Sequence, residues 1–356
     1  MSPRANADRR FAAALIRWQR QHGRHDLPWQ GTRDPYRVWL SEIMLQQTQV
    51  STVLGYYDRF LTRFPDVHAL AAATPDDVMA LWSGLGYYSR ARNLHRCAQT
   101  VVEVHGGVFP GTAAELERLP GIGASTAAAI AAFCFGERIS IVDGNVRRVL
   151  GRLLAFEGDL SSAAAQRELW ARAQALLPVA PSHADMVAYT QGLMDLGAGL
   201  CARSRPECGR CPAADLCLAH RQGLEDRYPV KSRRAIRRHE SWWLLVLRSS
   251  AAEGARIWLE RRPARGIWAG LHCVPVTLDE PAALALAGPA ADTAQPLPSF
   301  THALTHKELR LQPLLVDGVP EATYAHLQDG AWVAPDDLEK IGLPAPVRSL
   351  LTQLAG

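Results

Sequence analysis

Two carboxylates in the first half of the chain stand in contexts that suit opposite chemical tasks. Glu42 lies beside an apolar series within Ser41–Gln49. A glutamate here is usually a surface residue of an amphipathic helix, but one tipped into an apolar pocket would have a raised pKa and could donate a proton. Asp143 immediately precedes a helical segment, which it is expected to cap. Amides at a helix start also keep a carboxylate ionised, so Asp143 could face a developing cation.

Four of the seven cysteines fall within 17 residues, at Cys201, Cys208, Cys211 and Cys217. In a cytosolic chain of this size, such clustering indicates a metal site rather than disulfides. Zinc sites usually show two short Cys-x2-Cys pairs, whereas this segment has one pair and two longer gaps. The spacing therefore favours an iron–sulfur cluster, with structural zinc as the alternative.

A glycine-containing turn, LPGIGAST at residues 119–126, lies between two segments that read as helices. Gly121 and Gly123 permit a hairpin and leave backbone N–H groups exposed where the second helix begins. Such amides bind a phosphate without reading base sequence. A Gly-x-Gly turn alone is often only a tight helix connection, but the full pattern is typical of a DNA-binding helix-hairpin-helix.

Lysine is nearly absent from the chain, which has 36 arginines but only Lys231, Lys307 and Lys340. Chemistry that needs a lysine amine, such as Schiff-base formation, is therefore excluded from the first 230 residues. The formal net charge of +4 permits a nucleic-acid partner without requiring one. Neither a secretory signal nor a membrane span is evident. We therefore expect a cytoplasmic protein, nucleoid-associated if bacterial, with no membrane partner.

The elements that must position these groups divide the chain into a helical part and a mixed part. Residues 1–224 read as mostly helical, with one helix expected from Asp34-Pro35 to the stop at Phe64-Pro65-Asp66. Residues 225–240 read as a basic linker, either a solvated loop or a strand along a phosphate backbone. Residues 241–356 read as short strands closed by a helix, with a loop at 281–298.

Several motifs together resemble the MutY family of adenine DNA glycosylases, in the helix-hairpin-helix superfamily that includes endonuclease III. They are LPWQ (27–30), WLSEIMLQQTQV (39–50), LWSGLGYYSRARNLH (81–95), LPGIGAST (119–126), VDGNVRR (142–148), MDLGA (194–198) and the four-cysteine segment. The resemblance spans nearly the whole chain. It implies a multidomain protein with an all-α helix-hairpin-helix glycosylase region, followed by an α+β MutT-like (Nudix-fold) domain. A six-helix barrel module would cover about 29–143, and a cluster module would combine 1–28 with 144–224.

The activity implied by this resemblance is base excision repair. The enzyme would flip adenine out of double-stranded DNA and hydrolyse its N-glycosidic bond when adenine is mispaired with 8-oxoguanine, and also with G. A 4Fe–4S cluster on the four clustered cysteines would order a loop that contacts DNA. The protein would act as a monomer.

The resemblance also assigns roles to single residues. Glu42 matches the general acid that protonates adenine at N7, Asp143 the carboxylate that stabilises the sugar cation, and Asn145 a residue that positions these groups. Residues around the oxidised guanine would be Gln47, Thr48, Leu85 and Tyr87, with Tyr87 pushed into the base stack. Residues lining the adenine pocket would be Gln30, Leu45, Val50 and Gln191, for which ordinary packing is the alternative.

Ser125 and the C-terminal domain refine the expected reaction. Bifunctional relatives carry a Schiff-base lysine where Ser125 stands, so we expect a monofunctional enzyme that leaves an abasic site. Residues 271–295 lack the paired glutamates of a Nudix hydrolase, so this domain should recognise rather than hydrolyse. The family's Phe-Ser-His loop aligns with Leu304, Thr305 and His306, where the hydroxyl is kept and the aromatic ring is lost.

Two rival functions are an endonuclease III-like enzyme acting on oxidised pyrimidines and a non-enzymatic lesion-binding protein. The missing lysine and the additional C-terminal domain argue against the first. The presence of both Glu42 and Asp143 argues against the second.

Overall fold

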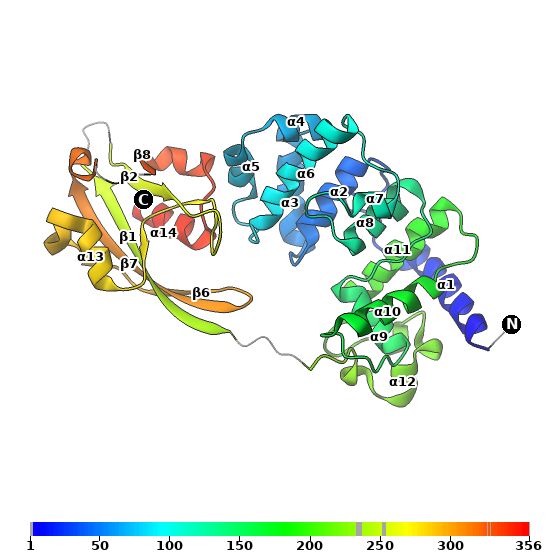
Figure 1. Ribbon diagram of the computed structural model, residues 1–356. Helices are drawn as coiled ribbons and strands as arrows, with labels where there is room; N and C mark the ends of the chain where they lie inside the picture. The colour runs from blue at the N-terminus through cyan, green and yellow to red at the C-terminus, as the bar shows by residue number, and fades with distance from the viewer. Residues whose placement is uncertain (1–2, 233–236, 251–253, 326, 328, 356) are drawn as a thin grey trace. The chain divides into compact units, whose positions relative to one another are not determined.

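The computed structural model describes residues 3–232, 237–250, 254–325, 327 and 329–355. The chain divides into two compact units, whose elements are labelled in Figure 1. The first unit consists of Met1–Tyr57, Asp66–His68 and Arg96–Arg234, and the second of Asp58–Pro65, Ala69–His95 and Ala235–Gly356. The helices at residues 50–63 and 89–105 therefore contribute residues to both units.

The first 224 residues are mostly helical, as the sequence predicts. The helices are α1 (Pro3–His22), α2 (Pro35–Leu45), α3 (Val50–Arg63), α4 (Val67–Ala72), α5 (Pro75–Trp82), α6 (Ser89–His105), α7 (Ala113–Leu116), α8 (Ala124–Ile130), the π-helix η1 (Ala131–Phe135), α9 (Gly144–Leu153), α10 (Ala163–Ala175), α11 (His183–Ala198) and α12 (Leu218–Gln222). Short 3-10 turns are η2 (Cys208–Arg210), η3 (Ala214–Leu216) and η4 (Glu225–Arg227). Among the described residues, no helix combines the length and apolar character that a membrane crossing requires.

The continuous helix expected between Asp34 and Phe64 is wrong, because the chain breaks it after Leu45. A turn at residues 46–49 separates α2 from α3, and Gln47 adopts a left-handed φ of 57°. Apolar residues recur on both sides of the turn, so the hydrophobic pattern alone does not reveal it. As a result, Gln47 and Thr48 lie on a turn and not along a helix face.

Local helix starts agree with the sequence. Asp34 accepts a hydrogen bond from the Tyr36 amide at 2.9 Å, and Pro35 occupies the first turn of α2. Thr74 and Asp77 form a capping box at the start of α5. These interactions span two or three residues, which is why sequence spacing is sufficient to predict them.

A buried apolar cluster holds α1 and the later helices of the first unit together. Phe11 and Leu15 of α1 pack in one cluster with Leu150 of α9 and Leu193 of α11. Phe11 also makes an edge-to-face contact with Tyr189, with ring centroids 6.4 Å apart. The core therefore fixes α9, which carries VDGNVRR, against α11, which carries MDLGA.

The first half of the expected linker packs against the first unit and is not a solvated loop. Val230 accepts a backbone hydrogen bond from Leu160 at 3.0 Å, and the buried Tyr228 donates its hydroxyl proton to Glu157 at 2.5 Å. Ser232 bonds to Asp159. Residues 233–236 of the expected linker lie outside the described residues, as do residues 251–253. The end of the expected linker is wrong, because Arg238–Glu240 already belong to strand β1 (Arg238–Ser249).

An eight-stranded mixed sheet with flanking helices forms the C-terminal part of the second unit. Its strands are β1 (Arg238–Ser249), β2 (Ile257–Arg261), β3 (His272–Cys273), β4 (Val276–Thr277), β5 (Gln295–Pro296), β6 (Phe300–Ala303), β7 (Lys307–Val319) and β8 (Gly330–Val333). β1 runs parallel to β7, pairing Arg238 with Lys307 through to Leu247 with Val316. Helix α14 (Ala345–Ala355) closes the chain, so the expected α+β class is confirmed.

The loop expected at 281–298 is also wrong. Helix α13 (Glu280–Ala287) begins at Asp279, which accepts a hydrogen bond from the Ala282 amide at 2.8 Å. Pro281 stands in the first turn, where a proline fits a helix, and the alanines that follow favour one. Ala283 and Ala287 then pack against the buried face of the sheet.

Candidate active site

Glu42 lies on α2 between buried neighbours and is itself partly buried. Burial, and to a lesser degree the charge of Asp143, raises the pKa of Glu42 to about 8. A carboxyl with this pKa is mostly protonated at neutral pH and can serve as an acid. The charge of Asp143, at the start of α9, thus acts on the Glu42 carboxyl of α2.

Asp143 is the N-cap of α9, as expected from the sequence. One of its carboxylate oxygens, Oδ1, accepts a hydrogen bond from the Val146 amide at 2.7 Å. The preceding Val142 amide donates to Ser125 Oγ at 3.2 Å. The hairpin hydroxyl thus anchors the segment that leads into Asp143, and the helix start holds the Asp143 carboxylate itself.

The hairpin between α7 and α8 has the geometry that its glycines suggest. Gly121 has a left-handed φ of 76°, and the buried Ile122 fixes the turn in the core. Gly123 is the N-cap of α8, and no side chain caps this helix. A Cβ at Gly123 would meet no atom within 4 Å, so the approach to this helix start is open.

Asn145 contacts an arginine network that sequence reasoning missed. Its Oδ1 accepts a hydrogen bond from Arg148 Nη2 at 2.9 Å, and the same guanidinium donates to the carbonyls of Gly197 and Cys201 at 2.6 and 2.8 Å. One turn later, the buried Arg152 donates to the Ala202 carbonyl at 2.7 Å. In a chain with 36 arginines, residue type alone gives no sign of these roles.

The four clustered cysteines line one cavity of about 30 Å³, whose other walls include the apolar residues Phe11, Val149, Leu153, Leu196 and Leu200. Burial raises the pKa of Cys211 to about 11, so its thiol is protonated unless a cation is bound. Four soft sulfur donors in an apolar shell fit a metal centre that displaces those protons. His220 and Glu225 lie beside Cys208, with the three possible ligand atoms within 4.8 Å of one another.

A second arginine organises the loop that carries Leu85 and Tyr87. Arg90 is buried and donates to the carbonyls of Leu85 and Gly86 at 3.1 and 3.2 Å. Its guanidinium also lies over the rings of Trp82 and Tyr87, at 5.2 and 5.6 Å from their centroids. Tyr87 itself is 46% exposed and has a left-handed φ of 48°. The loop thus presents a partly exposed aromatic ring above a buried arginine.

Thr305 and His306 are exposed in the tight turn between β6 and β7. The turn is closed by a hydrogen bond of 2.7 Å from the Leu304 amide to the Lys307 carbonyl. Within the second unit, the hydroxyls of Thr305 and Tyr87 lie 2.9 Å apart and share a hydrogen bond. Two residues 218 positions apart, both expected near the oxidised guanine, are thus brought together.

The four residues expected around adenine are all partly buried: Gln30, Leu45, Val50 and Gln191. Gln30 accepts a hydrogen bond from the Leu27 amide at 3.2 Å, and Gln191 donates to Asp195 at 2.8 Å. Both interactions are local, as the packing alternative expects.

The chain matches two families of known domains. Residues 40–175 match the HhH-GPD superfamily of base excision DNA repair proteins, and residues 244–353 match the NUDIX domain. It is 32% identical to the adenine DNA glycosylase of Buchnera aphidicola (from Acyrthosiphon pisum) over 96% of both chains. It is 37% identical to the human adenine DNA glycosylase over 76% of this chain and 58% of that protein. A thermostable thymine-DNA glycosylase superposes with a TM-score of 0.55 and 26% identity, over 62% of this chain and all of the other.

Proposed function

This chain belongs to the adenine DNA glycosylases of the HhH-GPD superfamily, and from that premise we propose that it removes adenine opposite 8-oxoguanine, and also opposite G, as a monofunctional enzyme. It is a DNA N-glycosylase, a hydrolase of base excision repair. The observation that carries the proposal is the pairing of Glu42, whose pKa is raised to about 8, with Asp143 at the start of α9.

The two carboxyl groups divide the work of breaking the glycosidic bond. Adenine is a poor leaving group as an anion, so Glu42 donates a proton to N7 as the bond lengthens. The sugar then resembles an oxocarbenium ion, which the ionised Asp143 stabilises. Asn145 positions this site through its bond to Arg148. Gln30, Leu45, Val50 and Gln191 would line the pocket that receives the flipped base.

Ser125 is the basis for proposing that the enzyme stops at an abasic site. Its hydroxyl is engaged with the Val142 amide, and the sequence offers no lysine before Lys231. Strand cleavage by a Schiff-base route needs an amine nucleophile near the sugar. Water therefore supplies the hydroxyl of the abasic site, either by attacking the sugar cation directly or by hydrolysing a transient ester between the sugar and Asp143.

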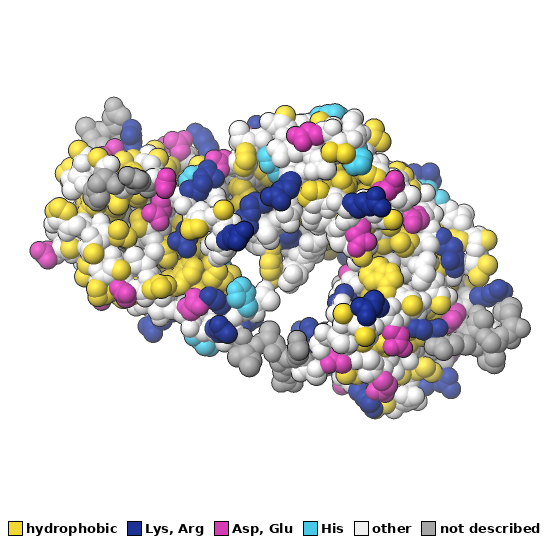
Figure 2. All heavy atoms as spheres, viewed as in Figure 1, with side chains coloured by type: hydrophobic (Ala, Val, Ile, Leu, Met, Phe, Trp, Pro, Cys, Tyr) yellow, Lys and Arg dark blue, Asp and Glu magenta, His cyan; other side chains and the backbone are white. Residues whose placement is uncertain are grey.

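Double-stranded DNA with the mispair is the proposed partner of a monomeric enzyme. On the face drawn in Figure 2, basic and acidic side chains are interspersed. We propose that phosphate binding rests on local sites. The hairpin at Gly121 and Gly123 offers amides for one phosphate. Tyr87, with Leu85, Gln47 and Thr48, would hold the opened stack, while Thr305 and His306 read the oxidised guanine. We assign base removal to residues 1–224 and lesion reading to 241–356, which the sheet extends to Arg238, so that the connection is the part of 225–240 before Arg238.

We propose that Cys201, Cys208, Cys211 and Cys217 hold a 4Fe–4S cluster. Replacing Cys211 by serine is expected to remove iron and the brown colour, because a thiolate ligand is lost from the cavity. Iron and zinc content of the purified protein measure this directly. Cys97→Ala is the matched control, since Cys97 is buried elsewhere in the chain and should leave the iron content unchanged. Zinc in place of iron in the unaltered protein would contradict the proposal.

A single-turnover assay tests substrate and reaction together. Duplexes with A opposite 8-oxoguanine, G or T are incubated with the protein and analysed with and without alkali. We expect strand breaks only after alkali, fastest opposite 8-oxoguanine and slowest opposite T. Strand breaks without alkali, or a substantial covalent adduct after borohydride, would show a lyase activity and refute the proposal that the enzyme is monofunctional. Equal rates for the three opposing bases would refute the lesion specificity.

A further inference from the structure

Within the second unit, residues 76–92 meet residues 261–348 along a line of hydrogen bonds that we name the seam. Ser83 Oγ and Tyr88 Oη donate to the Leu343 carbonyl at 2.9 and 3.0 Å, and Arg92 Nη1 donates to the Ala269 carbonyl at 2.6 Å. These bonds end on backbone oxygens, so they fix position without depending on a charged partner. The Tyr87–Thr305 hydrogen bond belongs to the same seam.

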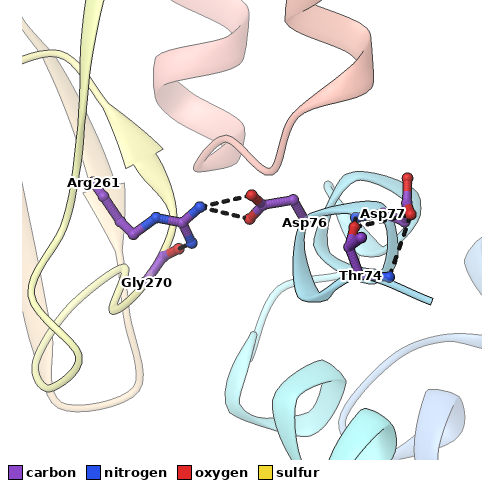
Figure 3. Close-up of polar contacts among 5 residues, drawn as sticks. All are labelled: Thr74, Asp76, Asp77, Arg261 and Gly270. Atoms are coloured by element: carbon purple, nitrogen blue, oxygen red, sulfur yellow. Dashed lines mark hydrogen bonds and ion pairs between the residues drawn. The ribbon is translucent and has the colours of Figure 1, made fainter. Parts of the chain in front are cut away.

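An ion pair at the seam differs from these bonds because both its groups are charged. One guanidinium nitrogen of Arg261, Nη2, lies 2.8 and 2.7 Å from the two carboxylate oxygens of Asp76, as Figure 3 shows. A second nitrogen, Nη1, donates to the Gly270 carbonyl at 3.3 Å. The guanidinium is thus held by its own sheet region while it binds the carboxylate. Hydrogen bonds between two charged groups are stronger than those between neutral ones.

The carboxylate of Asp76 is likewise held by its own element, helix α5. It lies in the first turn of α5, where a negative charge interacts favourably with the helix dipole. The capping box of Thr74 and Asp77 fixes this helix start, and Figure 3 shows it beside the ion pair. Both charged side chains are 45% exposed, so the pair adds little to the free energy of unfolding. Removing the ion pair therefore tests how the two segments are positioned and should hardly change the stability of the fold.

We propose that Asp76 and Arg261 are positioning residues for lesion recognition, because their ion pair is a charged contact between the segment that carries Tyr87 and the sheet that carries Thr305. This inference rests on the proposed function for its choice of lesion. Neither residue touches the bond that breaks, and neither belongs to the Glu42–Asp143 site. The pair should therefore affect the choice between 8-oxoguanine and G, and leave the chemical step on an A:G duplex unchanged.

The test compares Asp76→Asn, Arg261→Gln and the double variant in single-turnover assays on A:8-oxoguanine and A:G duplexes. Each single variant is expected to lower the ratio of the two rates by about two- to fivefold, the range for a half-exposed ion pair. The double variant should lose no more than the worse single variant, because both remove one interaction. Thr305→Ala shows how far the ratio falls when the hydroxyl proposed to contact 8-oxoguanine is removed. Arg20→Gln is the matched control, since it breaks an exposed ion pair to Asp185 in the first unit.

The outcomes separate this inference from the proposed function. If the unaltered protein shows no preference for 8-oxoguanine, the proposed specificity fails, and amide exchange then tests positioning alone. Faster exchange in peptides covering 74–92 and 261–271 in both single variants would support the ion pair as a positioning device. Unchanged exchange would overturn it. If the preference exists, an unchanged ratio, an equal loss on both duplexes or additive losses in the double variant would each overturn the inference.

Discussion

Replacing Asp143 by asparagine is expected to slow adenine release from an A:8-oxoguanine duplex by at least about 10³-fold. Asparagine keeps an oxygen that can accept the bond now made by the Val146 amide, and it is as good an N-cap as aspartate. The fold should therefore survive while the charge that stabilises the sugar cation is lost. Single-turnover base release measures the effect, and fluorescence anisotropy with labelled duplex should show nearly unchanged DNA binding.

A matched cap elsewhere separates the loss of charge from the loss of a helix cap. Asp279 begins α13 in the same way, accepting a hydrogen bond from the amide three residues later at 2.8 Å. Asp279→Asn should leave base release unchanged and should alter the melting temperature about as much as Asp143→Asn does. Normal base release by Asp143→Asn would refute the assignment of Asp143. A joint loss of DNA binding and folding would show that Asp143 acts as a structural cap.

The parts of the site that the sequence predicts are those set by short-range interactions. Asp143 as a cap and the hairpin at Gly121 follow from the preferences of a few neighbouring residues. The sequence alone does not predict the raised pKa of Glu42. Burial in the folded chain causes that rise, and a sequence pattern only suggests the burial. The family resemblance supplied the pairing of Glu42 with Asp143, which residue spacing alone does not give.

The features that sequence reasoning missed depend on long-range contacts or on backbone angles. Arg148 joins Asn145 to carbonyls about 50 positions away, and Arg90 matters because of two rings stacked around it. Neither arrangement produces a periodic pattern in the sequence. The turn at Gln47 was missed because the apolar residues around it recur as they would in one helix. In each case the residue types are ordinary, and only the folded arrangement gives them a role.

The pH dependence of base release is expected to report the protonation of Glu42. Because the pKa of Glu42 is raised to about 8, the acid form predominates below that value. The single-turnover rate should therefore be nearly flat from neutral pH up to about pH 8 and fall about tenfold for each further pH unit. Glu42→Gln cannot donate a proton, so it should lose about 10²- to 10⁴-fold in rate and show no such decline.

A second partly buried glutamate provides the control for this profile. Burial also raises the pKa of Glu260 in β2, which is not part of the proposed site. Glu260→Gln should retain both the rate and its decline above pH 8. If the Glu42→Gln variant kept the decline, the titrating group would be another residue and Glu42 would not be the acid.

The same raised pKa predicts that Glu42 lowers the free energy of unfolding at neutral pH. Below the ordinary glutamate pKa near 4.5, both folded and unfolded chains hold this proton, and Glu42 weakens folding least. As pH rises from there to about 8, the unfolded chain releases the proton while the folded chain keeps it, so stability falls. Glu42→Gln has no such proton and should melt at a higher temperature than the unaltered protein, increasingly so up to pH 8. An equal melting temperature across this range would mean that the site does not hold Glu42 in its acid form. The proposed proton donor would then lack the environment that makes it an acid.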